Sequence, residues 1–186
     1  MSATVYQPSA DFVKNAHISG MPAYQALCKE AESDYEGYWA RLAKEFISWK
    51  TPFTKVLDES KAPFFKWFED GTLNASYNCL DRQVENGLGK KTAIIFEGDD
   101  PKESKNITYQ ELSDEVCKLA NGLKEIGVKR GDRVTIYMPM VPEGVYAMLA
   151  CTRIGAIHSV VFGGFSPDSI VNRILDCKSE FVITAD

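Results

Sequence analysis

The chain has 186 residues, of which 45% are hydrophobic and 11% aromatic, and it carries 21 Lys and Arg against 26 Asp and Glu. This composition supplies a packed core and excludes disorder along the whole chain. The formal net charge of -5 argues against nucleic acid as a partner, because phosphate binding needs basic patches. The length fits one domain, or one domain with a terminal extension.

Cysteine usage and the N-terminus indicate the compartment. Five cysteines stand without a Cys-x-x-Cys pair, at positions 28, 79, 117, 151 and 177. The odd count and scattered spacing argue against a disulfide framework or a zinc site, and they favour a reducing, cytoplasmic location. His17 and His158 match no metal-ligand spacing. No signal peptide and no apolar stretch of about 18 residues is present, so no membrane association is expected.

Residues 1–80 are rich in aromatic side chains and predict a helical and irregular N-terminal extension. Helices are expected near 22–32 and 35–48, and Asp34 suits the N-cap of the second. Prolines and glycine interrupt residues 49–75, which predicts irregular structure with short strands at most. We expect the aromatic side chains of this arm to pack on something larger.

A regular α/β pattern starts after residue 80. Thr92–Phe96 predicts a strand, and Lys105–Thr108 is expected to return beside it as a short antiparallel strand. The segment Thr108 to Glu111 forms a capping box, in which the Thr hydroxyl and the Glu carboxylate each accept from an N-terminal amide. The helix that follows is expected to end before Gly127, which suits the left-handed residue past a helix end.

Strands and helices then alternate to the end of the chain. Further strands are expected at Asp132–Met138, Ile157–Phe162 and Phe181–Ala185, with a helix over Pro142–Ile154 and another capped by Ser166. The two later strands are continuous apolar runs. Ile157–Phe162 is predicted to be buried on both faces, and Phe181–Ala185 is predicted to be an interior strand of the sheet. The last helix is expected to turn three apolar side chains inward: Ile170, Ile174 and Leu175.

This alternation predicts an α/β fold with a mostly parallel sheet and right-handed crossover helices. The expected division is an extension over 1–80 and a truncated α/β domain over 81–186. Because the last apolar strand lacks a covering helix, we expect the natural chain to continue past Asp186.

Two local motifs are rejected as functional sites. Gly87–Thr92 resembles a phosphate-binding loop, but Val84 replaces its first glycine and a strand follows it instead of a helix. The segment Asp99-Asp100-Pro101 follows a strand as in phospho-acceptor domains, yet its pattern is that of a solvated turn. No catalytic constellation is found, and carboxylates such as Glu143 and Asp168 suit the first turns of helices.

The segment from Phe162 to Pro167 is the best candidate for a ligand site. It follows a predicted parallel strand and leads into a helix N-terminus, at the edge where open α/β sheets bind ligands. Gly163 and Gly164 allow close backbone approach by a ligand, and Phe162 or Phe165 could contact a purine. Spacing alone leaves a second interpretation open, namely a tight turn between strand and helix.

Several longer segments resemble the AMP-forming acetyl-coenzyme A synthetases, within the adenylate-forming superfamily. The resemblance runs from about Tyr24 to Asp186, and the segments that carry it are Lys66–Asn74, Tyr77–Arg82, Phe96–Pro101, Ile136–Glu143, Ala147–Cys151 and Gly155–Pro167. The chain resembles the acetyl-specific members more than the propionyl-specific ones. Gln83 is a small departure, where the family often has His.

The resemblance implies a ligase that converts acetate, ATP and coenzyme A to acetyl-CoA, AMP and pyrophosphate through acetyl-adenylate, with Mg²⁺. It implies that Phe162, Gly163 and Gly164 line the pocket for the adenine of coenzyme A. The phosphate loop, the acetate pocket and the adenylation lysine of the family would lie after Asp186, in the remainder of the enzyme. The isolated chain is therefore expected to be inactive, and no catalytic residue is assigned in it. The alternatives are a propionyl-specific relative and a free-standing, non-catalytic nucleotide- or CoA-binding module.

Overall fold

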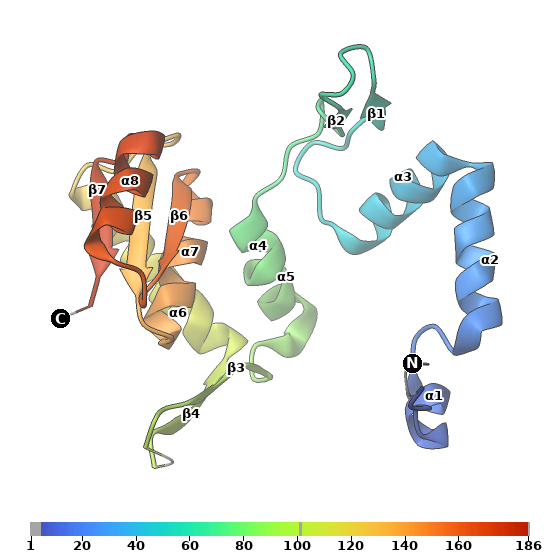
Figure 1. The fold of residues 1–186 in the computed structure, drawn as a ribbon, viewed down its shortest axis with the longest axis horizontal. Helices are drawn as coiled ribbons and strands as arrows, with labels where there is room; N and C mark the ends of the chain where they lie inside the picture. The colour runs from blue at the N-terminus through green and yellow to red at the C-terminus, as the bar shows by residue number, and fades with distance from the viewer. Residues whose placement is uncertain (1–4, 101, 186) are drawn as a thin grey trace. The chain divides into compact units, whose positions relative to one another are not determined.

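A computed structural model describes residues 5–100 and 102–185. The chain divides into two compact units, Met1–Thr72 and Leu73–Asp186 (Figure 1). In the part of the chain that the model describes, no helix combines the length and apolar character that crossing a membrane requires.

The first unit is mostly helical. Its elements are α1 (Ala10–Asn15), α2 (Gly20–Ser33), α3 (Tyr35–Phe46), β1 (Leu57–Asp58) and β2 (Lys66–Trp67). The two helices predicted at 22–32 and 35–48 are confirmed, with ends shifted by one or two residues. Asp34 is the N-cap of α3, and its Oδ1 accepts from the Gly37 amide at 3.0 Å. The six-residue helix α1 was not predicted, because it is too short to show a helical period.

Several aromatic side chains of the first unit pack on one another. Phe53 is only 7% exposed, and its ring lies 4.5 Å from Phe68 and 5.0 Å from Trp49. Trp67 extends this cluster to Trp39, with 6.3 Å between ring centroids. Edge and tilted contacts of this kind are favourable for aromatic rings. Within the first unit these rings form an aromatic cluster of their own, and the prediction that the aromatics of the arm pack on something larger stays a prediction.

The second unit contains the α/β fold. Its elements are α4 (Ala75–Cys79), α5 (Asp81–Gln83), η1 (Val84–Leu88), β3 (Thr92–Glu97), β4 (Ser104–Thr108), α6 (Tyr109–Glu125), β5 (Arg133–Met138), α7 (Pro142–Ile154), β6 (Ile157–Phe162), α8 (Pro167–Cys177) and β7 (Phe181–Thr184). The mixed α/β class and the helical N-terminal arm are confirmed. The short helical turns before β3 were not predicted.

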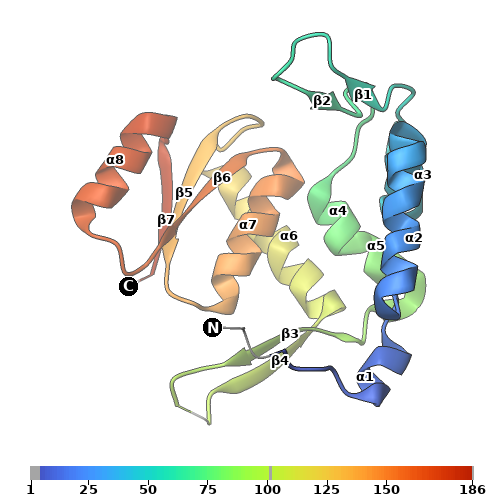
Figure 2. The ribbon, with the colours of Figure 1, turned by 45° about the vertical axis from the view of Figure 1, so that its right-hand side comes forward.

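Three strands form a parallel sheet in the order β6-β5-β7. From β5 the chain passes through α7 to β6, and from β6 it passes back through α8 to β7. Right-handed crossovers that run in opposite directions place their helices on opposite faces. Figure 2 shows α7 and α8 on opposite sides of this sheet. β3 and β4 form a separate antiparallel ribbon. The alternation of elements had implied that β4 joins the parallel sheet, but it does not.

The places of β6 and β7 in the sheet correct two predictions. Both strands pair only with β5 among the described residues, so both are edge strands. Ile157, Val160 and Val182 are 55%, 52% and 51% exposed, whereas Val134 and Ile136 of β5 are buried. A continuous apolar run specifies two apolar faces, but the strand order depends on the direction of the crossovers, which the run does not encode.

Helix α8 also departs from its prediction. Ile170 and Ile174 are half-buried as expected. Leu175, which was expected to face inward, is 69% exposed. Neighbouring side chains of a helix point about 100° apart around its axis. Ile174 faces the protein, so Leu175 points away from the same packing surface.

The core of the second unit forms between α6, α7 and the sheet. Val116 and Leu123 of α6 are buried with Ala150 and Cys151 of α7 in one cluster. Burial raises the pKa of the Cys151 thiol to about 11, so this cysteine behaves as a small hydrophobic side chain. Val116 and Leu123 of α6 thus face the core.

Both ends of α6 follow the predicted local motifs. Thr108 Oγ1 accepts from the Glu111 amide at 3.3 Å, and Glu111 Oε2 accepts from the Thr108 amide at 2.8 Å. Gly127 has a φ of 98°, and the Val128 amide donates to the Leu123 carbonyl at 3.0 Å. The capping box and the left-handed closing glycine are therefore confirmed.

We expect Glu111→Gln to weaken the chain in a pH-dependent way. The Thr108 amide and hydroxyl hold the pKa of the Glu111 carboxyl below its ordinary value of 4.5. A lowered folded-state pKa stabilises the fold above the unfolded-state pKa, and this contribution is lost as pH falls through the folded-state pKa. The urea midpoint of Glu111→Gln should lie below that of the unchanged chain at pH 7, and the two midpoints should converge as pH falls through the lowered folded-state pKa of Glu111. A difference that stays constant between pH 7 and pH 3 would contradict this assignment.

The rejected motifs lie in ordinary turns. Gly87–Thr92 leads into β3, with Gly87 in the left-handed region at a φ of 81°. Asp100 Oδ1 accepts from the Lys102 amide at 2.9 Å, as a turn residue does; Pro101 lies outside the described residues. Glu143 and Asp168 lie in the first turns of α7 and α8, as predicted.

Polar contacts hold the segment before β3 against the end of α7. The Asn74 side-chain amide donates to the carbonyls of Thr152 and Arg153 at 3.2 and 3.1 Å. The Arg153 guanidinium forms a two-pronged ion pair with the Asp81 carboxylate, at 3.1 and 2.7 Å. The two Asn74 hydrogen bonds satisfy carbonyls that the last turn of a helix otherwise leaves without partners.

Candidate functional site

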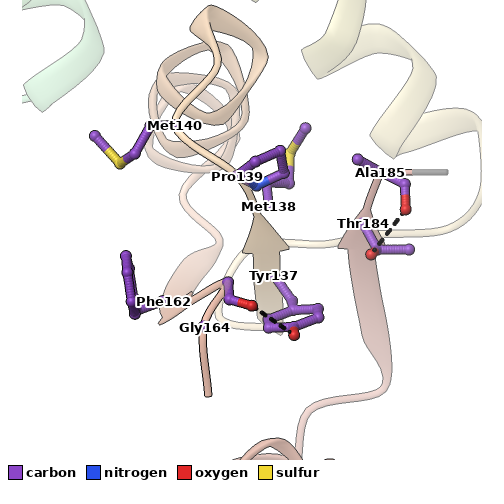
Figure 3. Close-up of a pocket in the computed structure, with 9 residues that line it drawn as sticks. Tyr137, Met138, Pro139, Met140, Phe162, Gly164, Thr184 and Ala185 are labelled. Atoms are coloured by element: carbon purple, nitrogen blue, oxygen red, sulfur yellow. Dashed lines mark hydrogen bonds between the residues drawn. The ribbon is translucent and has the colours of Figure 1, made fainter. Parts of the chain in front are cut away.

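A cavity of about 430 Å³ lies at the carboxyl ends of the three parallel strands (Figure 3). It is lined by Tyr137, Met138, Pro139, Met140, Phe162, Gly163, Gly164, Thr184 and Ala185. The first four end or follow β5, the next three end or follow β6, and the last two end or follow β7. All three strands therefore contribute to one site.

The topology of the sheet explains why the cavity forms there. Met138 and Phe162 are paired at the last register position of β5 and β6. After this pair, one loop leads to α7 on one face, and the other leads to α8 on the opposite face. Where neighbouring loops diverge in this way, a crevice opens outside the strand ends, and open α/β sheets bind ligands at such points.

Two of the three predicted site residues are glycines that lie close to other groups of the protein. A Cβ at Gly163 would lie 3.2 Å from the Met138 carbonyl oxygen, and a Cβ at Gly164 would lie 2.7 Å from the Phe162 ring. The sequence left two interpretations of both glycines open, namely close approach by a ligand and a tight turn between strand and helix. A side chain at Gly163 would displace the Met138 backbone by a few tenths of an ångström, and a side chain at Gly164 would make the exposed Phe162 ring move.

Phe162 itself is available to a ligand. Its side chain is 62% exposed, and its ring meets Phe165 edge to face, with 5.8 Å between centroids. Figure 3 shows Phe162 and Met140 on the same side of the cavity mouth. An exposed aromatic ring at a cavity rim can accept a flat, apolar group.

None of the nine lining residues has a charged side chain. The Arg173 guanidinium of α8 lies over the Phe165 ring at 4.8 Å from its centroid, but Arg173 does not line the cavity. The polar groups that line the cavity are mainly backbone atoms, together with the Tyr137 and Thr184 hydroxyls. The site therefore suits an uncharged, flat ring system, and polyphosphate groups would need cations from elsewhere in the protein.

Most of the lining was missed by reasoning from the sequence. Tyr137, Pro139 and Met140 received no role, although they lie near or beyond the end of a predicted strand, at the same edge of the sheet as Phe162. The available signal was this shared edge, because the carboxyl ends of parallel strands lie side by side. Within residues 5–100 and 102–185, no group of three His, Cys, Asp or Glu side chains could hold a metal ion.

Two family models match the chain. Residues 80–186 match the model of the AMP-binding enzymes, and residues 24–79 match the model described as acetyl-coenzyme A synthetase N-terminus. Together they account for all but the first 23 residues.

Curated relatives agree with these models. Proteins named acetyl-coenzyme A synthetase from Ralstonia pickettii and Cupriavidus metallidurans are 64% and 62% identical to it over 98% of the chain, which is 27% of their own length. A protein of the same name from Thiobacillus denitrificans is 59% identical over 98% of the chain and 28% of its own length. The chain thus spans about a quarter of the length of the curated relatives it matches. On these matches, the chain belongs to the AMP-binding enzyme family and is similar to its acetyl-coenzyme A synthetase members.

Proposed function

We propose that this chain is part of an acetate–CoA ligase. In the first step, acetate attacks the α-phosphate of ATP, which forms acetyl-adenylate and releases pyrophosphate. In the second step, the thiol of coenzyme A attacks the acetyl carbonyl, AMP leaves, and the thiol proton is released. The names of the relatives at 59–64% identity support this reaction. They do not favour a free-standing binding module or a propionyl-specific enzyme.

The cavity at the strand ends is proposed to receive the adenine ring of coenzyme A. Phe162 offers an exposed aromatic surface, and the backbone at Gly163 and Gly164 offers polar groups to the edge of the base. An uncharged, aromatic-rimmed cavity fits a purine better than it fits a phosphate chain or acetate. The position of these three residues at one cavity rim is the observation that carries the proposal.

The remaining parts of the reaction are proposed to depend on sequence beyond this chain. ATP and acetate bring several negative charges, and the described cavity offers no cation to them. Mg²⁺ finds no fitting ligand group among the described residues, so no step is assigned to it here. The division into an extension over 1–80 and the first part of a larger domain over 81–186 stays a prediction within this proposal.

Phe162→Ala in the complete protein tests the cavity assignment. Contact between a base and an aromatic ring is worth about 1–3 kcal/mol, so the KM for coenzyme A should rise about tenfold or more. Acetate-dependent exchange of pyrophosphate into ATP reports the first step without coenzyme A, and it should continue at an unchanged rate.

Ile95→Ala is the control, because Ile95 is 76% exposed on β3 and lines no part of the cavity. Its KM for coenzyme A should equal that of the unchanged protein. An unchanged KM in Phe162→Ala would exclude this residue from the coenzyme A site. Steady acetate- and CoA-dependent release of AMP by the 186-residue chain alone would contradict the assignment of the chemistry to later sequence.

A further inference from the structure

We propose that Tyr137 is a positioning residue for the coenzyme A site, acting through the loop that carries Phe162, Gly163 and Gly164. This inference rests on the proposed function of the cavity and adds a residue that neither the sequence motifs nor the family matches single out. Tyr137 lies on the central strand β5, one residue before its end. Its hydroxyl reaches across to the loop that follows β6 (Figure 3).

The hydrogen bonds of the Tyr137 hydroxyl hold the loop that follows β6. Tyr137 Oη donates to the Gly163 carbonyl at 2.8 Å, and it lies 3.4 Å from the Phe165 carbonyl. A single hydroxyl proton favours the shorter contact, and the longer one is a weaker alternative. The Phe165 amide in turn donates to the Phe162 carbonyl at 3.0 Å. Tyr137 therefore fixes the turn that sets the direction of the Phe162 ring.

Side chains on the same face of β5 also contact the end of α8, in the connection that runs from β6 through α8 to β7. Arg133 lies four residues before Tyr137, and side chains separated by an even number of strand positions share a face. The Arg133 guanidinium donates to the carbonyls of Cys177 and Lys178, at 2.9 and 3.0 Å, where α8 ends. The central strand thus anchors the β6–α8 crossover at both ends, and Tyr137 supplies the anchor beside the cavity.

Loss of the Tyr137 hydroxyl should change binding more than folding. The hydrogen bond is exposed, so water can replace the hydroxyl at the Gly163 carbonyl. The fold then keeps its stability, but the loop is no longer held in one conformation. A ligand that needs the ordered loop must restore that order when it binds, which weakens its affinity.

The test uses Tyr137→Phe in the complete protein, with coenzyme A and with pantetheine, a thiol acceptor that lacks the adenine nucleotide. We expect the KM for coenzyme A to rise about fivefold, which corresponds to one hydrogen bond of ordinary net strength. The kcat with coenzyme A and the kcat/KM for pantetheine should stay unchanged. The inhibition constant of adenosine 3′,5′-bisphosphate against coenzyme A should rise by the same factor as the KM.

Tyr77→Phe is the matched control. It removes a tyrosine hydroxyl that hydrogen-bonds Glu85 at 2.7 Å, away from the cavity. Its KM for coenzyme A should not change. The double variant Phe162→Ala with Tyr137→Phe should have a KM close to that of Phe162→Ala alone, because both changes act on the same contact.

The outcomes separate the two proposals. A fivefold loss for coenzyme A and for pantetheine alike would show a general structural role and overturn the inference. A raised KM in Phe162→Ala with an unchanged KM in Tyr137→Phe would overturn the inference and leave the cavity assignment standing. An unchanged KM in Phe162→Ala would remove the cavity assignment and the inference with it.

Discussion

Replacing Leu80 by alanine is expected to lower the free energy of unfolding by about 3 kcal/mol. Leu80 is 1% exposed, which makes it one of the most deeply buried large side chains in the second unit. It enters from the turn between α4 and α5 and belongs to the core cluster with Leu112 and Val116 of α6. Its truncation removes buried methyl groups and leaves a cavity that the packed helices can only partly close.

Urea titration of the chain measures this effect, with Leu175→Ala as the matched control. Leu175 is 69% exposed on α8, so the same truncation there should change the free energy of unfolding by less than about 0.5 kcal/mol. Equal effects of the two changes would show that the segment around Leu80 does not contribute to the core. A loss confined to the Leu80 variant supports the observed packing.

Asp81→Asn is expected to cost about 2 kcal/mol, between the values for exposed and fully buried ion pairs. The Asp81 and Arg153 side chains are 28% and 22% exposed, and their nearest atoms are 2.7 Å apart. The substitution keeps the shape of the side chain but removes the charge that compensates the Arg153 guanidinium. Arg153 Nε is already buried without a hydrogen-bond partner, so the guanidinium would lose its main compensation.

The control for this charge effect is Glu115→Gln. Glu115 pairs with Lys118 at 2.8 Å, but the two side chains are 45% and 72% exposed. Solvent screens such a pair, and its loss should cost less than about 0.5 kcal/mol. Urea titrations at 0.1 M and 1 M NaCl should show a larger cost for the Asp81 change at both salt concentrations. Equal costs for both variants would contradict a structural role for the Asp81–Arg153 pair.

In the second unit, local motifs predicted those features that depend only on neighbouring residues. The capping box at Thr108 and the closing glycine at Gly127 depend on contacts within five residues, so their patterns are complete in the sequence. The antiparallel return of β4 beside β3 follows in the same way from a short turn. The short helices α4 and α5 were missed, because five and three residues show no reliable period.

The candidate site was predicted only in part. The pattern of a strand end followed by glycines indicated the segment after Phe162, with a tight turn as the second interpretation. The assignment of Phe162, Gly163 and Gly164 to a ligand came from the family resemblance. The sequence could not pair them with Tyr137, whose hydroxyl approaches from a strand 26 residues earlier. That contact depends on the parallel register of β5 and β6, which no local pattern states.

The sequence by itself determined the α/β class, the limits of most helices and strands, and the loop after Phe162 as the candidate site, because hydrophobic period and capping are local properties of the chain. Only the tertiary structure decided that β5 is central, that β6 and β7 are edge strands, and that three strand ends enclose one cavity. Strand order results from the direction of the crossovers and the packing of α7 and α8 on opposite faces. These are relations between distant segments, and their free energy appears only when the segments meet.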